Sequence, residues 1–568
     1  MLLVNPNAHL PPMKFPLHSL VLTLLLFVAA WPAVGQVPDQ LKHSLLPVGA
    51  GPTAGSGFSV AVDGNLTVVG APGDDAGALH SGTVRVYDTA TGLLLHVLLN
   101  PIPSANTYFG WSVGISGTSV VVGVPYDLIG TAKAGSAYVY DISSATPTVP
   151  VAAFHNPAPA DYDEFGYAVA ISGTRVVIGV PGDDVGTAQS EPDNLGRVYI
   201  YDLSSATPTI PAAGLSNLQS FPNFGRCVGI SGTRVVVAAR TSETRGSGRV
   251  FTYDLSGAQP AIPRARLEDP GFDPFSSFGS VVAISGTRVV VGDPYASYSI
   301  GPRSVSAGSA YVYDVSSATQ PSLSTTLLPV STFRNPAPFP MGGEGFGVAA
   351  AISGTRMVVG ASRAIFTATT GSASIYDLSS PTPTAPLATL NKPTPATIDG
   401  FGYAVAISGT NVVVGAPGNQ GAAHIFGPSP YSLWKVSELN NQFAPDLGDP
   451  DYDGVSNLSE YGLLRSATIP NGAPTAAASA LYAEGERLRL FVPRDPTHND
   501  ITVEVQATGD LVSGPWTTIA TSTLGAPFTG PGYVGGDDAT PAVKTVEVRD
   551  TVSISSTTQR WLRVKVTH

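Results

Sequence analysis

One short segment combines aspartates at alternate positions with a glycine and, further on, a glutamate. In DPDYDGVSNLSE, residues 449–460, side-chain oxygens stand at positions 1, 3, 5, 9 and 12, and a valine stands at position 7. Hard oxygen ligands at this spacing are typical of a calcium loop, in which the glycine makes a sharp turn, position 7 offers its backbone carbonyl and the glutamate binds through both oxygens. The sequence therefore predicts one Ca²⁺ site, held by Asp449, Asp451, Asp453, Val455, Asn457 and Glu460.

The segments on either side of this loop are predicted to be short helices. YSLWKVSELNNQF, residues 431–443, has its apolar residues on one helical side, and NLSEYGLL follows as an exit helix. The loop resembles an EF-hand loop and, more closely, the single loops of dockerin and thrombospondin type 3 modules. One unpaired loop implies a structural calcium site that stiffens a hinge over residues 431–466, whereas cohesin binding would need a second such segment. An acidic turn that holds no metal is the alternative.

The remaining residues suited to acid–base chemistry are scattered. His80 is close to Asp74 and Asp75 in the sequence, but so short a spacing within one loop arises easily by chance. Asp183 and Asp184 could in principle cleave glycosides, but neighbours on an extended chain point apart. The sequence has no nucleophile elbow, no histidine pair at metal-ligand spacing and no phosphate-binding glycine loop. We therefore expect a protein that is not an enzyme; a secreted polysaccharide hydrolase or lyase is the alternative.

These acidic residues lie between copies of a phrase that recurs seven times and reads FGYAVAISGTRVVIGVP in its third copy. A repeat of this size indicates stacked supersecondary units, each too small to bury its own hydrophobic face. The elements that position any functional residue in this region must therefore be repeated sheets. The copies begin, at intervals of 51 to 68 residues, at Phe58, Phe109, Phe165, Phe224, Phe278, Phe346 and Phe401.

Each copy predicts four antiparallel strands. A short strand such as YAVAI ends in an SGT turn (DGN in the first copy), whose glycine accepts positive φ, and a doubly buried RVVV strand follows. GSAYVYD and a weaker strand after SSATPT complete the unit. Four strands at this period are typical of a propeller blade, so the sequence predicts a seven-bladed β-propeller over residues 43–427. The last copy lacks its fourth strand, and we expect His43–Val48 to pair with Ala422–Gly427 and close the ring.

The phrase resembles the FG-GAP repeats of integrin α-subunit propellers and their bacterial relatives. Phe-Gly matches in six copies, and Gly-Ala-Pro matches fully at residues 70–72 and 415–417. The calcium sites of integrin-like blades do not carry over, because the three-residue SGT or DGN turn leaves no room for six or more oxygen ligands. Integrin ligand recognition does not carry over either, because it depends on loops and partner domains that this chain does not match.

The connections of a propeller alternate between its two faces. The SGT and SSATP turns share one face and are nearly uniform, whereas the loops after GAP and between blades vary in length and chemistry, as a binding face would. Ordinary solvated loops are the alternative. The candidate ligand-face residues are Asp74, Asp75, His80, Asp127, Asp183, Asp184, Glu191 and Asp193.

Composition and the N-terminus bound the class of protein. A formal net charge of −12 disfavours nucleic acid and anionic membranes as partners.

Residues 1–35 predict a signal peptide, because Lys14 precedes an apolar run and small residues follow that run. An uncleaved membrane anchor is the alternative. Translation starts at Met1 or Met13. No later segment is long enough to span a membrane. Cys227, the single cysteine, forms no intramolecular disulfide and is predicted to be a small buried filler.

The C-terminal segment, residues 480–568, predicts a small β-sandwich, because RLRLFVP, ITVEVQ, TVEVRD and WLRVKVT alternate apolar and polar residues. Its role would be to sort, to anchor or to bind carbohydrate. The expected fold is therefore all-β: a seven-bladed propeller, a calcium-loop hinge with helices and a sandwich. The expected function is binding or adhesion without catalysis, at the cell surface, in the periplasm or outside the cell, with a glycan or an extracellular protein as partner. A purely structural module of a surface array is the other alternative.

Overall fold

The structure is a computed structural model that carries side chains. The part of the chain that it describes comprises residues 37–47, 54–183, 195–216, 221–239, 248–271, 276–300, 303–322, 324–336, 345–362, 371–392, 399–418, 421–430, 432–433, 461, 478–482, 485–508, 515–534, 542–552 and 561–568. The predicted signal peptide and the predicted calcium loop lie outside these residues. Apart from helical backbone at Pro430, Ser432, Leu433 and Tyr461, the ordered elements among them are β-strands, so the all-β class is confirmed.

Within the described residues, seven antiparallel sheets follow one another along residues 40–427, which we call the repeat region. The first sheet contains β2 (Ser59–Asp63), β3 (Leu66–Ala71), β4 (Thr83–Asp88) and β5 (Leu94–Leu99), and the second contains β6 (Ser112–Ser116), β7 (Ser119–Val124), β8 (Ser136–Asp141) and β9 (Ala152–His155). The third sheet contains β10 (Ala168–Ser172), β11 (Arg175–Val180), β12 (Arg197–Asp202) and β13 (Ala213–Ser216), and the fourth contains β14 (Cys227–Ser231), β15 (Arg234–Ala239), β16 (Arg249–Asp254) and β17 (Ala265–Leu267).

The last three sheets contain insertions and a strand from the N-terminal side. They are β18 (Val281–Ser285), β19 (Arg288–Asp293), β22 (Ser309–Asp314) and β24 (Ser331–Arg334); β25 (Phe346–Ser353), β26 (Arg356–Ala361), β27 (Ser372–Asp377) and β28 (Ala388–Asn391); and β29 (Ala404–Ser408), β30 (Asn411–Ala416) and β31 (Ala422–Gly427) with β1 (Gln40–Leu45). In the fifth repeat, β20 (Ser297–Ile300) and β21 (Arg303–Ser306) form an additional hairpin. The same repeat contains the short strand β23 (Thr326–Leu327), which pairs in parallel with β17 of the fourth repeat.

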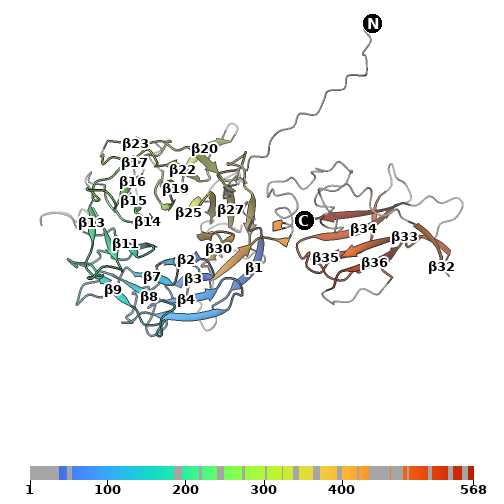
Figure 1. Cartoon of the computed structure of the whole chain (residues 1–568), viewed down its shortest axis with the longest axis horizontal. Helices are drawn as coiled ribbons and strands as arrows, with labels where there is room; N and C mark the ends of the chain where they lie inside the picture. The colour runs from blue at the N-terminus through green and yellow to red at the C-terminus, as the bar shows by residue number, and fades with distance from the viewer. Residues whose placement is uncertain are drawn as a thin grey trace, which may run out of the picture. The chain divides into compact units, whose positions relative to one another are not determined.

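The first strand of each repeat contacts the first strand of the next. β2 contacts β6, β6 contacts β10, β10 contacts β14, β14 contacts β18, β18 contacts β25 and β25 contacts β29, which in turn contacts β2. In Figure 1, β14 lies nearer to the middle of the repeat region than β16, β17 and β23 of the same sheet. The second strands are buried on both faces, as their runs of valine predict: Val120, Val121 and Val122 of β7 are fully buried.

The SGT and DGN turns also join one repeat to the next. Their glycines all have positive φ, between 54° and 61°. Each glycine donates its N–H to a side-chain oxygen of the turn before it; for example, Gly173 bonds to Ser116 Oγ at 3.0 Å and Gly117 bonds to Asp63 Oδ2 at 2.7 Å. The first repeat bonds to the seventh in the same way, from Gly64 to Ser408 Oγ at 3.2 Å. The same bond occurs in all seven turns.

The opposite ends of the strands bring the Phe-Gly and Gly-Ala-Pro motifs of successive repeats together. A Cβ on Gly123 would lie 2.0 Å from the carbonyl oxygen of Gly166, so only glycine fits there. The same contact joins Gly415 of the seventh repeat to Gly57 of the first, at 2.1 Å.

The contact of Gly57 corrects the start of the first copy. Ser56 pairs with Gly421 through an isolated parallel bridge, just as Phe165 pairs with Gly135. Ser56 therefore occupies the phenylalanine position and Gly57 the glycine position, and the first copy begins two residues before Phe58. The sequence pointed to Phe58 as the start because it is the one phenylalanine near that glycine.

The N-terminal strand pairs with the partner predicted for it. β1 runs antiparallel to β31, with Ser44 opposite His424 and Leu45 opposite Ala423. It begins three residues earlier than the predicted start at His43, and Val48 lies outside the described residues. Leu45 is only 3% exposed, whereas the next residue, Leu46, is 65% exposed.

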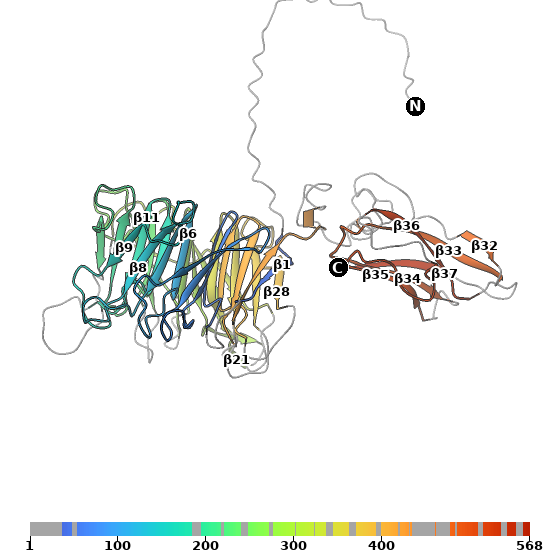
Figure 2. The same cartoon turned by 90° about the horizontal axis from the view of Figure 1, so that it is seen from below.

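The C-terminal module contains two three-stranded sheets. One comprises β32 (Ala478–Tyr482), β33 (Gly485–Arg494) and β36 (Lys544–Arg549), and the other β35 (Thr517–Thr523), β34 (Thr502–Thr508) and β37 (Trp561–Thr567). Figure 2 shows one sheet above the other. Both contribute to one apolar core, for example Val492 and Val548 from the first and Val505 and Ile519 from the second.

The predicted hinge with helices is not supported. Ser432 and Leu433, the described residues of the predicted helix 431–443, and Tyr461, beyond Glu460, have helical backbone, but the rest of both segments lies outside the described residues. No helix in the described part of the chain is both long and apolar enough to cross a membrane.

Candidate functional site

The residue after the Phe-Gly glycine stands at the start of each first strand, at the end opposite the SGT turns. Because the glycines of successive repeats are in contact there, these residues are brought together from segments more than fifty positions apart. The position carries an aromatic ring in four of the seven repeats. Its occupants are Phe58, Trp111, Tyr167, Arg226, Ser280, Val348 and Tyr403.

The four aromatic rings at this position form one continuous set of contacts. The ring centroids of Phe58 and Trp111 are 4.8 Å apart, those of Phe58 and Tyr403 are 5.2 Å apart, and those of Trp111 and Tyr167 are 5.5 Å apart. Arg226 places its guanidinium 5.0 Å from the centre of the Tyr167 ring, a cation–π distance. We call these five residues, which are all partly exposed, the aromatic cluster.

Two further tyrosines extend the cluster outward. Tyr108 and Tyr126 meet Trp111 edge to face, with centroids 6.1 and 6.2 Å away. The Tyr126 hydroxyl donates to Glu164 Oε1 at 2.9 Å. Burial raises the pKa of the Glu164 carboxyl, and burial together with the Glu164 charge raises the pKa of Tyr126, so the phenol remains a hydrogen-bond donor at neutral pH.

The loops that surround the cluster have a strained backbone. Six of the seven non-glycine residues with positive φ in the described part of the chain belong to these loops. Such a conformation costs about 1–2 kcal/mol for a residue with a Cβ and tends to persist at functional sites. The six residues are His80 (49°), Asn106 (62°), Tyr108 (59°), Tyr162 (65°), Glu164 (61°) and Asn223 (55°).

One repeated position accounts for half of this strain. The residue before the Phe-Gly motif is Gly55, Gly345 or Gly400 in three repeats, with φ of 61°, 61° and 67°. Three other repeats have Tyr108, Glu164 and Asn223 in the same left-handed conformation. These repeats keep a side chain where glycine would fit more easily, and the first two of these side chains contact the aromatic cluster or its tyrosines.

The family model for the FG-GAP repeat matches four segments of the chain, residues 43–87, 103–140, 155–201 and 390–426. These four segments are similar to FG-GAP repeats. They contain Phe58, Trp111, Tyr167 and Tyr403, the four rings of the aromatic cluster. A search of curated proteins finds no match to the chain.

Three predicted ligand-face aspartates lie inside the segments that match the FG-GAP model. Asp74 is buried and pairs with Arg85 Nη2 at 2.9 Å. Asp127 is buried and accepts the Tyr138 hydroxyl at 2.7 Å. Asp183 is also buried, 3.7 Å from Arg197 Nε, and accepts the Tyr199 hydroxyl at 3.4 Å. Each aspartate follows the Gly-Ala-Pro motif or its variant and binds the third strand of its own sheet.

The histidine of the first loop does not form an acid–base pair with its aspartates. Asp75 Oδ1 accepts the backbone N–H of His80 at 2.8 Å. The His80 ring instead has Nδ1 3.3 Å from Asn106 Oδ1 and stacks on Tyr108, with centroids 5.9 Å apart. His80 therefore borders the aromatic cluster. The remaining candidates, Asp184, Glu191 and Asp193, lie outside the described residues.

The predicted calcium ligands Asp449, Asp451, Asp453, Val455, Asn457 and Glu460 also lie outside the described residues. Among the residues that are described, no three His, Cys, Asp or Glu side chains converge to form a metal site.

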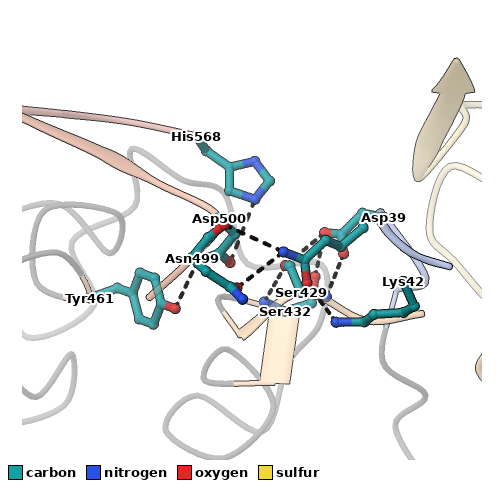
Figure 3. Close-up of polar contacts among 9 residues, drawn as sticks. Asp39, Lys42, Ser429, Ser432, Tyr461, Asn499, Asp500 and His568 are labelled. Carbon is teal, nitrogen blue, oxygen red and sulfur yellow. Dashed lines mark hydrogen bonds and ion pairs between the residues drawn. The ribbon is translucent and has the colours of Figure 1, made fainter. Parts of the chain in front are cut away.

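The described residues that border this segment form ordinary polar contacts (Figure 3). Tyr461 donates its hydroxyl to Asp500 at 2.9 Å, and Ser432 donates its hydroxyl to Asp39 at 2.6 Å.

Cys227, the single cysteine, fits the predicted role of a packed filler. Burial raises the pKa of its thiol, and its Sγ accepts the N–H of Val282 at 3.3 Å.

The aromatic cluster could not be predicted from the sequence, because its residues meet only when distant repeats pack together. A signal was nevertheless present. Trp111, Tyr167 and Tyr403 directly follow a Phe-Gly pair, at the position where the other repeats have arginine, serine and valine.

Proposed function

We propose that this chain is an exported binding or adhesion protein whose FG-GAP repeats present the aromatic cluster to a ligand. FG-GAP repeats are typical of extracellular adhesion-type proteins, and four of them match here. The observation that carries the proposal is the set of partly exposed rings of Phe58, Trp111, Tyr167 and Tyr403 beside Arg226, surrounded by strained loops. Tryptophan, tyrosine and arginine are the side chains that dominate binding hot spots.

We further infer that the seven repeats close into a seven-bladed β-propeller, with the ligand at the end opposite the SGT turns. Four contacts between the first and last repeats support closure. These are the β2–β29 contact, the pairing of β1 with β31, the Gly64–Ser408 bond and the approach of Gly415 to Gly57.

The chemistry of the cluster favours a glycan as ligand, with an extracellular protein as the other partner class. Aromatic rings pack against the apolar C–H faces of sugars, and tyrosine hydroxyls, Arg226 and Glu164 supply polar edges for sugar hydroxyls. Glu164 is the one carboxylate among the cluster and its flanking tyrosines, whereas most glycoside hydrolases use a pair. Binding without catalysis therefore fits better than hydrolysis.

A glycan and matrix-protein binding screen on the full chain, with and without calcium, tests the proposal. A ligand found in the screen should bind Trp111→Ala at least about tenfold more weakly, the effect of losing a central aromatic contact. Val151→Ala, an exposed change outside the cluster, is the matched control and should leave affinity unchanged. Equal affinities for Trp111→Ala and the parent chain would refute the assignment.

We also propose that residues 449–460 bind one Ca²⁺ with a structural role, outside the repeats. The ligand spacing supports this proposal, and export would expose the loop to calcium. Calcium should raise the thermal unfolding temperature of the full chain by mass action on the folded state. An Asp451→Ala variant that keeps the same response would contradict the site.

A further inference from the structure

A buried arginine in the fourth repeat occupies a position that is apolar in the neighbouring repeats. Arg264 donates its backbone N–H to Thr252, and Val151, Ala212, Val330 and Leu387 make the same bond in their own sheets. Val151 and Val330 are 58% and 64% exposed there, whereas Arg264 is only 6% exposed. The fourth repeat has thus placed a cation inside the protein where the second and fifth repeats expose a valine.

The fifth repeat supplies the cover for this arginine. The segment that leads into β23 crosses onto the fourth sheet, where Ser322 donates its N–H to the Pro263 carbonyl at 2.8 Å and β23 pairs with β17. Arg264 therefore lies between two repeats, at the end of the sheet that carries the SGT turns.

A second substitution makes room for the guanidinium. Gly257 stands where the equivalent turns have Ser144, Ser205, Ser317 and Ser380, three residues after the aspartate that ends the third strand. A Cβ on Gly257 would lie 1.9 Å from Arg264 Nη2. The glycine and the arginine thus depart from the repeat pattern together.

The guanidinium has few hydrogen-bond acceptors in the protein. Nη1 donates to the Thr319 carbonyl at 3.4 Å, a long bond, and Nε is buried without a partner. A guanidinium carries five N–H donors, and a buried cation is costly unless it is paired. Asp254, a carboxylate that lines the same cavity, accepts both the N–H and the hydroxyl of Ser256 through Oδ1, at 3.0 and 2.7 Å.

Arg264 lines a cavity of about 90 Å³, large enough for one small ion and not for an extended ligand. Arg234, Ser316 and Thr319 also line it, together with Asp254. Two arginines against one aspartate leave the cavity with a net positive charge. Planar guanidinium groups bind oxyanions through pairs of parallel hydrogen bonds, which matches the free donors of Arg264.

We propose that this cavity, between the fourth and fifth repeats, binds a small oxyanion such as a sulfate, phosphate or carboxylate group. The site lies at the end of the sheets opposite the aromatic cluster, so it is separate from the proposed ligand face. The anion bonds to Arg264, with Arg234 and Ser316 at the rim.

Thermal unfolding of the full chain in sodium sulfate, against sodium chloride of the same ionic strength, tests this site. At a tenfold excess over the dissociation constant, sulfate should raise the unfolding temperature by about 1–2 °C. Sodium phosphate and sodium acetate identify the preferred anion, and glucose 6-sulfate beside inorganic sulfate distinguishes a free ion from one carried by a sugar.

Two variants copy the other repeats and should therefore fold. Arg264→Leu recreates the residue of the sixth repeat, and Gly257→Ser refills the space that the guanidinium occupies. Each should weaken anion binding at least tenfold by titration calorimetry. Arg175→Leu, which changes the residue equivalent to Arg234 in the third repeat, is the matched control and should respond like the parent chain. An equal anion response in Arg264→Leu and the parent, or no response in the parent to any of the anions, would overturn the proposal.

Discussion

The two ends of the repeated sheets differ in how uniform their residues are from one repeat to the next. At one end, every SGT or DGN turn donates a glycine N–H to the turn before it, and the acceptor is a serine hydroxyl in six of the seven bonds and the Asp63 carboxylate in the other. At the other end, aromatic rings, an arginine and strained non-glycine residues differ from repeat to repeat. The comparison teaches that uniform residues join the repeats, and that variation is concentrated at the end where a ligand is proposed to bind.

The largest expected effect concerns the strand that joins the two ends of the repeat region. Leu45→Ala on β1 should lower the free energy of unfolding by about 2–4 kcal/mol, because this buried side chain belongs to one apolar cluster with Val62, Val69 and Val413. Leu46→Ala, one residue further and exposed, should change it by less than about 0.5 kcal/mol. Chemical denaturation of both variants measures the difference. Equal losses would mean that β1 does not pack as described.

The pH dependence of stability gives the next effect. Burial, with a contribution from Lys392, lowers the pKa of His424 to about 4, against the attraction of Asp399. A depressed histidine pKa means that the folded state favours the neutral ring. Stability is therefore full above the unfolded pKa of about 6.5 and falls as the pH drops toward 4, by about 2 kcal/mol between pH 7.5 and 4.5.

His424→Phe, which copies Phe251 of the fourth repeat, should flatten this pH dependence. The comparison isolates His424, because Asp293, whose pKa burial raises to about 6, contributes with the opposite sign to both proteins. Thermal unfolding across this pH range provides the measurement. Parallel curves for the variant and the parent would contradict the role of His424.

A smaller effect of opposite sign should appear in the strained loops. Tyr162→Gly should raise the free energy of unfolding by about 1 kcal/mol, because glycine adopts the observed φ of 65° without a Cβ clash. Tyr295→Gly, at an exposed tyrosine without positive φ, is the matched control and should destabilise the protein. Destabilisation by both substitutions would show that the Tyr162 loop is not strained.

The smallest effect per residue is expected at the uniform end. Ser172→Ala removes the acceptor of the Gly232 N–H at 3.0 Å and should cost about 0.5–1 kcal/mol. The triple variant Ser116→Ala, Ser172→Ala and Ser231→Ala should cost about three times as much, since each serine serves a different turn. Ligand affinity should not change in either variant. A triple variant as stable as the parent would show that these bonds do not contribute to the free energy of unfolding.

Much of the fold follows from the sequence for local physical reasons. A Ser-Gly pair between valine-rich runs specifies a tight turn, and strands of period two specify which residues are buried, so the four-stranded units were predictable. The pairing of β1 with β31 was predictable too, because the last repeat lacked a strand.

The site was less predictable, because its residues meet only through tertiary structure. Trp111 and Tyr403 are far apart in the sequence, and both belong to one set of ring contacts through Phe58. Asp74 was predicted to be exposed because it lies in a loop, whereas its partner, Arg85, lies on the strand that follows the loop. The transfer of β23 to the fourth sheet left no sequence signal, since a two-residue strand has no period.

Hydrogen–deuterium exchange of the full chain, with and without a ligand from the binding screen, tests the division between the two ends most directly. We expect protection of residues 106–111, 162–167 and 223–226, which contain Trp111, Tyr167, Arg226 and their strained neighbours, and unchanged exchange at the turns 116–118 and 172–174. Protection at the turns, with none around Trp111 and Tyr167, would contradict this division.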